Sequence, residues 1–429
     1  MSKEENRKNF SKYVSQNILG MIGFSCYVLA DSYFISIAKG ADGLTALNLV
    51  MPLYSIIFSI GEMIGVGSAI RYAISKIKKD ADDYFWNALI WCILSSMLFV
   101  FAGIFFSADI MRVLGADEHI VAVGNNYTKI FMCFAPMFMC NYVTNAFVRN
   151  DGAPGIAMSA TLFSSLFNIV FDYILMFPMN LGMEGAALAT ALSPIIGMGI
   201  CSIHFFSKKS SVRLVVCKPS VRKLVAGCQL GVSAFVGEMS SAVITLAFNF
   251  VILKLAGNVG VAAYGVVANI AIVTTAVFNG VAQGSQPLIS SCFGRGDKDG
   301  CTQLKRMGYT TAFVLAAVMY SILFIFAGQF VAVFNSEGSE MLRLYATEGV
   351  KLYFIGIFFA GINIVGGGAF SATEDAFKAA VVSVARGFVL ILGAVFVMSA
   401  FFGMTGVWLA YAVAEGITTF IMLVMAMRV

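Results

Sequence analysis

Two acidic residues lie deep inside long apolar stretches of this sequence. Asp31 lies within the apolar run Tyr13–Lys39, and Asp172 lies within Ile156–Phe177. An ionisable side chain at the depth of a bilayer centre costs at least ~2.5 kcal/mol to insert, so it usually faces the protein interior or a wet cavity. A carboxyl group held there can exchange a proton or bind a cation. The two acids therefore predict an ion or proton path, which is typical of a transporter.

The composition predicts a membrane protein around these acids. Hydrophobic residues make up 59% of the 429 residues, charged residues make up 12%, and the mean hydropathy is +0.86. A soluble domain carries about 25% charged residues, so we expect an all-α protein that crosses the bilayer many times. The net charge of +5 lies in short loops without interleaved aromatic residues. Nucleic acid is therefore not an expected partner.

Twelve apolar runs are each long enough to cross a bilayer as a helix of about 20 residues. The tenth run is the weakest, because Glu348 and Lys351 lie near its start. The expected spans, in chain order, are 13–38, 45–74, 84–106, 120–148, 155–178, 183–206, 225–253, 259–291, 308–334, 345–371, 376–400 and 403–427.

Basic residues predict the orientation of these spans. With the N-terminus placed in the cytoplasm, 21 of the 28 Lys and Arg residues fall on the cytoplasmic side and six fall on the other side, while Arg386 lies within a span. Cytoplasmic loops of membrane proteins carry an excess of Lys and Arg. We therefore expect a multi-pass protein of the plasma (inner) membrane with both termini in the cytoplasm.

An internal repeat divides the chain into two halves. The segments Gly182–Ala191 and Gly403–Ala412 are identical at six of ten positions, at an offset of 221 residues. A weaker match at an offset of 217 pairs Gly43, Ala46, Val50, Gly67 and Ser68 with Gly260, Ala263, Val267, Gly284 and Ser285. Each half has an even number of spans, so the repeat is parallel, with a pseudo-twofold axis along the membrane normal. The sequence thus predicts two six-helix lobes, 1–206 and 224–429, joined by a basic cytoplasmic linker, 207–223.

Several short motifs, taken in order along the chain, resemble those of the multidrug and toxic compound extrusion (MATE) transporters. They are Asp31-Ser-Tyr-Phe-Ile35 followed by Gly43-Leu-Thr-Ala46, Arg149-Asn-Asp-Gly-Ala-Pro154, Asn168-Ile-Val-Phe-Asp172, and the segment Gly182–Ala191. The resemblance covers nearly all of the chain, and the order and spacing of the motifs make it specific. It implies twelve spans in two lobes, and the export of organic cations in exchange for protons or sodium ions, without ATP or another cofactor.

The resemblance also implies which residues couple transport to the ion. Asp31, Asn168, Asp172 and Thr190 would line one pocket in the amino-terminal lobe. Asn168 and Asp172 are four residues apart and therefore share a helix face. Two acids in a low-dielectric pocket would bind protons more tightly and titrate as a coupled pair. A sodium ion could replace the proton there, bound by carboxylate, amide and hydroxyl oxygens.

Glu238 resembles the seventh-helix glutamate of the NorM-type branch of this family, which takes part in cation or substrate binding in the other lobe. The aspartate that this branch carries in its tenth span is absent from Ala360–Gly368. Glu238 is therefore a candidate for substrate binding or a secondary cation site, with a NorM-style site in doubt. The first span also lacks the proline that many members carry, since Ser15, Gln16 and Asn17 stand there. A proline-driven bend of that helix is not expected.

Other ionisable residues in the spans have structural explanations. We expect Glu62, Glu415 and Arg386 to form structural pairs, and His204 to lie at the membrane interface. The functional alternatives to antiport are a lipid-linked sugar flippase of the same superfamily and a passive channel. An enzyme is not expected, because the sequence has no nucleophile–base or metal-binding constellation and no P-loop for a nucleotide. The expected partners are small cationic molecules and the lipid bilayer.

Overall fold

The computed structural model describes residues 3–76, 81, 83–213, 215–334 and 339–427. Lys78, Lys79 and Arg428, which enter the count of basic residues, lie outside this described part of the chain. The described residues are helical almost throughout and include no strand. The expected all-α fold is confirmed.

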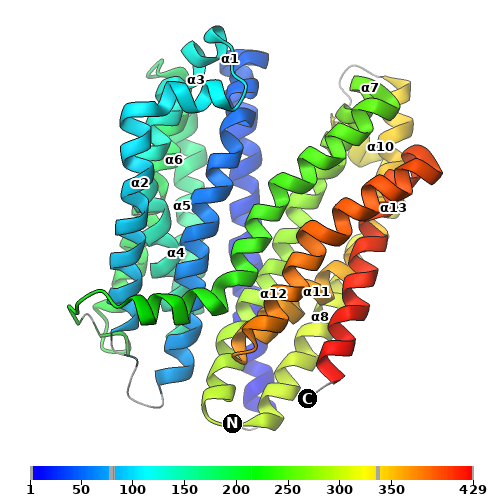
Figure 1. The fold of residues 1–429 in the computed structure, drawn as a ribbon. Helices are drawn as coiled ribbons and strands as arrows, with labels where there is room; N and C mark the ends of the chain where they lie inside the picture. The colour runs from blue at the N-terminus through cyan, green and yellow to red at the C-terminus, as the bar shows by residue number, and fades with distance from the viewer. Residues whose placement is uncertain (1–2, 77–80, 82, 214, 335–338, 428–429) are drawn as a thin grey trace.

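Three long helices are each divided into two arms by a glycine with non-helical dihedral angles. They are α1 (Lys3–Ser75) with Gly40 at φ 57° and ψ −140°, α7 (Val221–Gly294) with Gly257 at φ 63° and ψ −158°, and α13 (Leu390–Met427) with Gly403 at φ 56° and ψ −136°. A positive φ favours glycine, because a Cβ atom would be strained there. The chain reverses direction at each of these glycines, as Figure 1 shows.

The other helices are shorter. Two of them lead into the next helix through an irregular turn, namely the 3₁₀ turn Phe354–Gly356 after α10 and the π-helical turn Ala385–Val389 after α12. The bounds are α2 (Tyr84–Val113), α3 (Glu118–Cys133), α4 (Ala135–Asn150), α5 (Pro154–Met176), α6 (Gly182–Phe205), α8 (Lys298–Ile325), α9 (Ala327–Phe334), α10 (Glu340–Tyr353), α11 (Ile357–Ala372) and α12 (Ala376–Val384).

These helices account for the expected spans. α3 and α4 meet at 46° and together form the fourth span. α10 and α11 form one span, and α12 continues into the first arm of α13. When the two arms of α1, α7 and α13 are counted separately, the described residues contain twelve apolar spans, as predicted from hydropathy.

Three predicted boundaries are wrong by about ten residues. α8 begins at Lys298 rather than at residue 308, and it ends at Ile325 because Phe326 leaves helical geometry at φ −103° and ψ 19°. The first span already begins at Lys3 rather than at residue 13. Hydropathy detects the apolar part of a helix, whereas α1 and α8 each begin with polar turns.

The helices form two groups, which we call the amino lobe (α1–α6) and the carboxy lobe (α7–α13). In Figure 1 the lobes approach each other at the end of the molecule that holds both termini, which we call the terminal side, and they diverge toward the opposite end. α7 begins beneath the amino lobe and then rises along the carboxy lobe. The two-lobe architecture is confirmed, while the limits 1–206, 207–223 and 224–429 stay a prediction.

The backbone repeats between the lobes. Gly40 and Gly257, which are 217 residues apart, have nearly equal dihedral angles. Gly182 and Gly403, which are 221 residues apart, have φ values of 51° and 56°. These are the two offsets seen in the sequence, so the repeat is a property of the fold.

The lobes cross at small residues. A Cβ atom on Gly67 of α1 would overlap the backbone of α7 at Gly227, and a Cβ atom on Gly284 of α7 would overlap the backbone of α1 at Val14. Gly67 and Gly284 are equivalent positions of the repeat. Glycines allow helices in a membrane to approach closely, so the paired crossings hold α1 against α7 on the terminal side.

Asp151, which directly follows α4, ties together the terminal side of the amino lobe. Its carboxylate accepts hydrogen bonds from Tyr72 Oη (2.8 Å), Lys76 Nζ (2.6 Å) and the Ser211 backbone N–H (2.8 Å), and His204 Nε2 lies 2.9 Å away. Burial acts to raise the pKa of Asp151, but the hydrogen bonds from Lys76 and His204 hold that pKa below its ordinary value. The ring of His204, a residue expected at the membrane interface, is buried against this carboxylate at the end of α6.

Candidate functional site

The four residues predicted to couple transport to an ion come together inside the amino lobe. Asp31 lies in the first arm of α1, Asn168 and Asp172 lie one turn apart on α5, and Thr190 lies on α6. Their exposed fractions are 6%, 0%, 0% and 2%, in that order. The Asn168 amide donates a hydrogen bond to Thr190 Oγ1 over 3.1 Å. The Asp31 and Asp172 carboxyl groups lie within electrostatic range of each other.

Several oxygens of this four-residue site have no fixed donor. Among the described residues, no donor reaches Asp31 Oδ1, Asn168 Oδ1 or either carboxyl oxygen of Asp172. An ionised carboxylate accepts but cannot donate, so the two acids can hydrogen-bond to each other only when one of them carries a proton. A buried polar atom without a partner costs about 1–3 kcal/mol. The arrangement is therefore suited to a shared proton or a bound cation.

The ligand chemistry narrows the kind of cation. The four side chains offer carboxylate, amide and hydroxyl oxygens, which are ligands for hard cations. Zinc and similar metals are held mainly by Cys and His. No group of three or more His, Cys, Asp or Glu side chains in the described part of the chain is arranged to hold a metal ion. The site thus fits a proton or a sodium ion better than a structural metal.

One face of α1 joins this four-residue site to a cavity. Asn17, Met21, Phe24, Tyr27 and Asp31 follow one another at spacings of three or four residues, so they share one helix face. The first four of them line a cavity of about 120 Å³. Tyr27 also lies within electrostatic range of Asp31. A movement of this arm of α1 would therefore act on both places at once.

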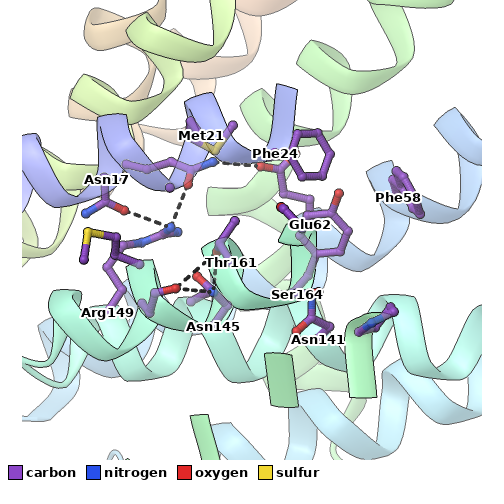
Figure 2. Close-up of a pocket in the computed structure, with 18 of the residues that line it drawn as sticks. Asn17, Met21, Phe24, Phe58, Glu62, Asn141, Asn145, Arg149, Thr161 and Ser164 are labelled. Atoms are coloured by element: carbon purple, nitrogen blue, oxygen red, sulfur yellow. Dashed lines mark hydrogen bonds between the residues drawn. The ribbon is translucent and has the colours of Figure 1, made fainter. Parts of the chain in front are cut away.

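The cavity lies where the two lobes meet. Most of its lining comes from α1, α4, α5 and α6, and the carboxy lobe contributes Glu238 and Gln283 of α7. Figure 2 shows side chains of α1 facing Asn145 and Thr161, which come from α4 and α5 and are joined by a 3.1 Å hydrogen bond. Aromatic rings attract cations, and methionine adapts to varied shapes. The lining residues of these two kinds are Met21, Phe24, Tyr27, Phe58, Phe138, Tyr142 and Met158.

A buried polar chain crosses the cavity from one lobe to the other. Arg149 of α4 donates from Nη1 to Gln283 Oε1 (2.6 Å) and to Asn17 Oδ1 (3.4 Å). The Gln283 amide in turn donates to Glu62 Oε1 over 3.3 Å. Glu62 also lies within electrostatic range of Glu238. Two acids therefore face this cavity, one from each lobe, while the guanidinium is held by amides.

Sequence reasoning identified Glu238 as a candidate but missed Asn17, Gln283 and the role of Arg149. A signal for part of this cluster was present. Asn141, Asn145 and Arg149 recur every four residues along an apolar run, which places three polar side chains on one helix face. Gln283 had no such signal, because only the crossing of α7 and α1 brings it to Arg149.

The carboxy lobe contains the structural pair expected for Arg386. Arg386 Nη2 donates to Glu415 Oε1 over 2.7 Å, and the Asn363 amide donates to Glu415 Oε2 over 2.7 Å. Thr419 Oγ1 donates to Asn363 Oδ1 over 3.0 Å. Arg386 and Glu415 thus neutralise each other inside the lobe. Glu62 differs, because its hydrogen-bond partner is the neutral amide of Gln283.

Comparisons with known proteins agree with the repeat and the helical architecture. The MatE family profile matches residues 17–174 and 234–397, one segment in each lobe. The multidrug export protein MepA of Staphylococcus aureus (strain MRSA252) is 27% identical over 420 residues, which cover 93% of this chain and 89% of that protein.

Solved structures share the fold at low sequence identity. The structure of MATE in complex with MaL6 has a TM-score of 0.93 at 20% identity, and the alignment covers 99% of this chain and 96% of that chain. An outward-facing conformation of a multidrug resistance MATE family transporter of the MOP superfamily has a TM-score of 0.92 at 20% identity, with the same coverage. At this identity the likeness concerns the fold alone.

Proposed function

The chain belongs to the MatE family of membrane transporters, and on this premise we propose that it is a secondary antiporter that exports cationic amphipathic compounds in exchange for protons or sodium ions. The observation that carries the proposal is the buried Asp31–Asp172 pair, whose oxygens lack donors among the described residues. Asp31 of this pair shares a face of α1 with residues that line the cavity between the lobes. An ion at the pair and a compound in the cavity would therefore each favour a different position of the first arm of α1.

In the proposed cycle, a proton or a sodium ion neutralises the Asp31–Asp172 pair. Loss of the like-charge repulsion lets α1 and α5 pack more closely. Met21 and Phe24, on the same arm of α1, then move relative to α4 and lower the affinity of the cavity for the compound. Rocking of the lobes carries the ion to the other side of the membrane, where its release restores that affinity.

We further propose that both termini are cytoplasmic and that the lobes are open to the outside of the plasma membrane in this structure. The excess of Lys and Arg on the terminal side supports this orientation. The terminal side is also where the lobes are joined by an Asn6–Gln303 hydrogen bond of 3.1 Å and by the Arg71–Glu374 ion pair. A closed cytoplasmic end with diverging lobes at the other end suits a state that takes up ions from outside (Figure 1).

The lining of the cavity favours a cationic compound over the anionic substrate of a lipid-linked sugar flippase. Glu62 and Glu238 face the cavity, and Arg149 is the single basic residue among the described residues that line it. That guanidinium already donates to Gln283 and Asn17. A pyrophosphate group would therefore meet more negative than positive charge. Transport without chemical conversion of the substrate is the activity that we propose.

The test is efflux of an organic cation from proteoliposomes that hold the purified protein, driven separately by a proton gradient and by a sodium gradient. The variant Asp31→Asn removes one of the two acids and keeps the size of the side chain. Its gradient-driven efflux is expected to fall to the level of empty liposomes. Asp42→Asn is the matched control, because Asp42 lies in the same long helix but is exposed beside His119.

Gradient-driven efflux by Asp31→Asn at the rate of the wild type would contradict the coupling role of Asp31. A steady conductance in the absence of any counter-ion gradient would instead favour the passive channel. Transport of a lipid-linked anion without cation efflux would favour the flippase. The three activities are therefore separated in one preparation.

A further inference from the structure

A second hollow lies away from the cavity, on the surface at the terminal side. It has a volume of about 920 Å³ and runs between the first turns of α1 and the start of α8. Its α1 wall includes Lys3, Arg7 and Val14, and its α8 wall includes Arg306 and Leu315. We call this hollow the α1–α8 groove. The groove shares no residue with the proposed ion site or with the lining of the cavity between the lobes.

The α1–α8 groove changes in polarity along its length. Toward the chain terminus and the start of α8, its lining includes the basic side chains of Lys3, Arg7 and Arg306, with Asp299 as the single acid among its described lining residues. Deeper along the two helices the lining becomes apolar or weakly polar. The residues of this deeper part are Phe10, Ser11, Val14, Ser15, Ile18, Met307, Thr310, Thr311 and Leu315.

The basic side chains of the groove are available for an anion. Lys3, Arg7 and Arg306 are exposed. Among the described residues, neither the Arg7 nor the Arg306 guanidinium has an ion pair or a hydrogen bond to another residue. The polar contacts that join the two walls use other groups, since Gln303 binds the Asn6 amide and the Lys3 carbonyl. The two walls are thus joined by other side chains, while Arg7 and Arg306 are exposed.

The depth of the groove matches one leaflet of a bilayer. At a rise of 1.5 Å per residue, Arg7 and Ile18 lie about 16 Å apart along α1, and Arg306 and Leu315 lie about 14 Å apart along α8. Half of the hydrocarbon core of a bilayer is about 15 Å thick. A basic rim at one end and a channel of this length, lined by apolar and hydroxyl-bearing side chains, correspond to the headgroup and the acyl chain of one phospholipid.

We propose that the α1–α8 groove binds an anionic phospholipid from the leaflet on the terminal side. Its phosphate lies between Arg7 and Arg306, and one acyl chain lies along Val14, Ile18 and Leu315. Charge complementarity selects an anionic headgroup, and the apolar length selects a lipid over a free phosphate ion. Basic pockets between transmembrane helices on the cytoplasmic side are suited to anionic headgroups, which agrees with the orientation proposed above.

The position of the lipid has a consequence for the lobes. The α1 wall belongs to the amino lobe and the α8 wall belongs to the carboxy lobe, so one headgroup would contact both. The lipid would then stabilise the closed terminal side together with the Asn6–Gln303 hydrogen bond. Binding itself does not depend on the proposed antiport, and it can be measured on a protein that transports nothing.

The test is native mass spectrometry of the full chain in detergent, titrated with palmitoyl-oleoyl phosphatidylglycerol or with the phosphatidylcholine of the same chains. We expect the wild type to bind phosphatidylglycerol in preference. The double variant Arg7→Ala/Arg306→Ala is expected to bind it roughly thirtyfold more weakly, since each basic residue near an anionic surface contributes about fivefold. The matched control is Lys8→Ala/Lys298→Ala, which removes two exposed charges from the same helices outside the groove.

A second variant tests the apolar part. Ser15 is exposed and lines the acyl channel, so Ser15→Trp would fill that channel while leaving both guanidinium groups in place. We expect it to lose the bound phosphatidylglycerol as well. Thermal unfolding of each variant in detergent checks that the fold is retained.

Four results would overturn the proposal. Equal binding of the two lipids would remove the charge selectivity, and an equal loss in the control variant would make the effect one of net charge. Competition by glycerol phosphate at the same concentration as the lipid would point to a bare phosphate site. The wild type could instead form a dimer and show no lipid preference, while the Arg7→Ala/Arg306→Ala variant is a monomer. That result would mean that a second copy of the chain covers the groove.

Discussion

The amino lobe and the carboxy lobe both bury acidic side chains in a membrane-spanning fold, but they compensate the charge differently. In the carboxy lobe, both oxygens of Glu415 accept hydrogen bonds from Arg386, and Oε2 also accepts one from Asn363. In the amino lobe, neither oxygen of Asp172 has a donor among the described residues. An acid with a fixed basic partner keeps its charge, whereas an acid without one can change its charge at low cost. This difference supports the proposal that the Asp31–Asp172 pair responds to an ion, whereas the Arg386–Glu415 pair keeps its charges.

The repeat makes the contrast sharper. At an offset of 217, the position equivalent to Asp31 is occupied by Phe248. At an offset of 221, Gly393 and Tyr411 stand where the amino lobe has Asp172 and Thr190. Duplication has therefore preserved the helices and their glycine turns, while Asp31, Asp172 and Thr190 of the proposed ion site are present in one copy.

The largest expected effect comes from breaking the compensated pair. Glu415→Gln would leave the Arg386 guanidinium buried without a counter-charge, and removal of one partner of a buried ion pair costs about 3–5 kcal/mol. Asp172→Asn removes a buried acid that has no basic partner, so its unfolding free energy is expected to stay the same or to rise. Unfolding in detergent, followed by fluorescence against temperature or denaturant, measures both variants.

Opposite effects of these two substitutions would support the comparison between the lobes. The double variant Arg386→Gln/Glu415→Gln should recover much of the stability lost in Glu415→Gln, because it removes both charges. Equal destabilisation by Glu415→Gln and Asp172→Asn would mean that the amino-lobe acid is structurally paired after all.

A smaller effect is expected at Glu62, the cavity acid whose partner is the neutral Gln283 amide. Glu62→Gln keeps an oxygen that can accept from Gln283 but removes the negative charge. The loss of a hydrogen bond to a charged group costs about 1.5 kcal/mol, so the KM for a cationic compound should rise roughly tenfold. Initial efflux rates in proteoliposomes at varied substrate concentration give this number, and an uncharged compound serves as the control substrate. An unchanged KM for the cation would limit Glu62 to holding Gln283.

The smallest effect concerns Asp151, a compensated acid within the amino lobe itself. Lys76 and His204 hold the folded-state pKa of Asp151 below the ordinary value of 3.8. Their contacts with the Asp151 carboxylate therefore contribute stability that is fully present above about pH 3.8. The contribution is lost as the pH falls through the lower pKa of the folded protein. Asp151→Asn should therefore lower stability at pH 7 and flatten the acid limb of the stability profile below about pH 4. A variant profile that remains parallel to that of the wild type would contradict this assignment.

Hydropathy was sufficient to predict the spans, because the cost of burying charge in lipid acts on every segment separately, and the internal repeat was sufficient to predict the two lobes. The motifs also brought Asp31, Asn168, Asp172 and Thr190 together correctly as neighbours in space. Helix ends were predicted less well. The start of α8 at Lys298 is polar, and no hydropathy signal separates a helix in water from a loop.

Contacts between the lobes were not predictable from one sequence. Gln283 meets Arg149 only because glycines at Gly67 and Gly284 let α1 and α7 cross closely. Within the amino lobe, the pairing of His204 with Asp151 also depends on tertiary packing, because it forms only where the end of α6 lies beside the end of α4. Such contacts follow from tertiary packing, which local patterns of residues do not encode.

If an incoming cation discharges the Asp31–Asp172 pair, the protein must take up that cation when a bound compound leaves. The measurement is proton or sodium uptake by the detergent-solubilised protein when a bound organic cation is displaced, followed with a pH indicator or a sodium-selective electrode. We expect the wild type to take up protons or sodium ions. The double variant Asp31→Asn/Asp172→Asn, in which Glu415 and Arg386 are unchanged, is expected to take up neither. Uptake of the same size by the double variant would contradict the discharge of this pair by the cation.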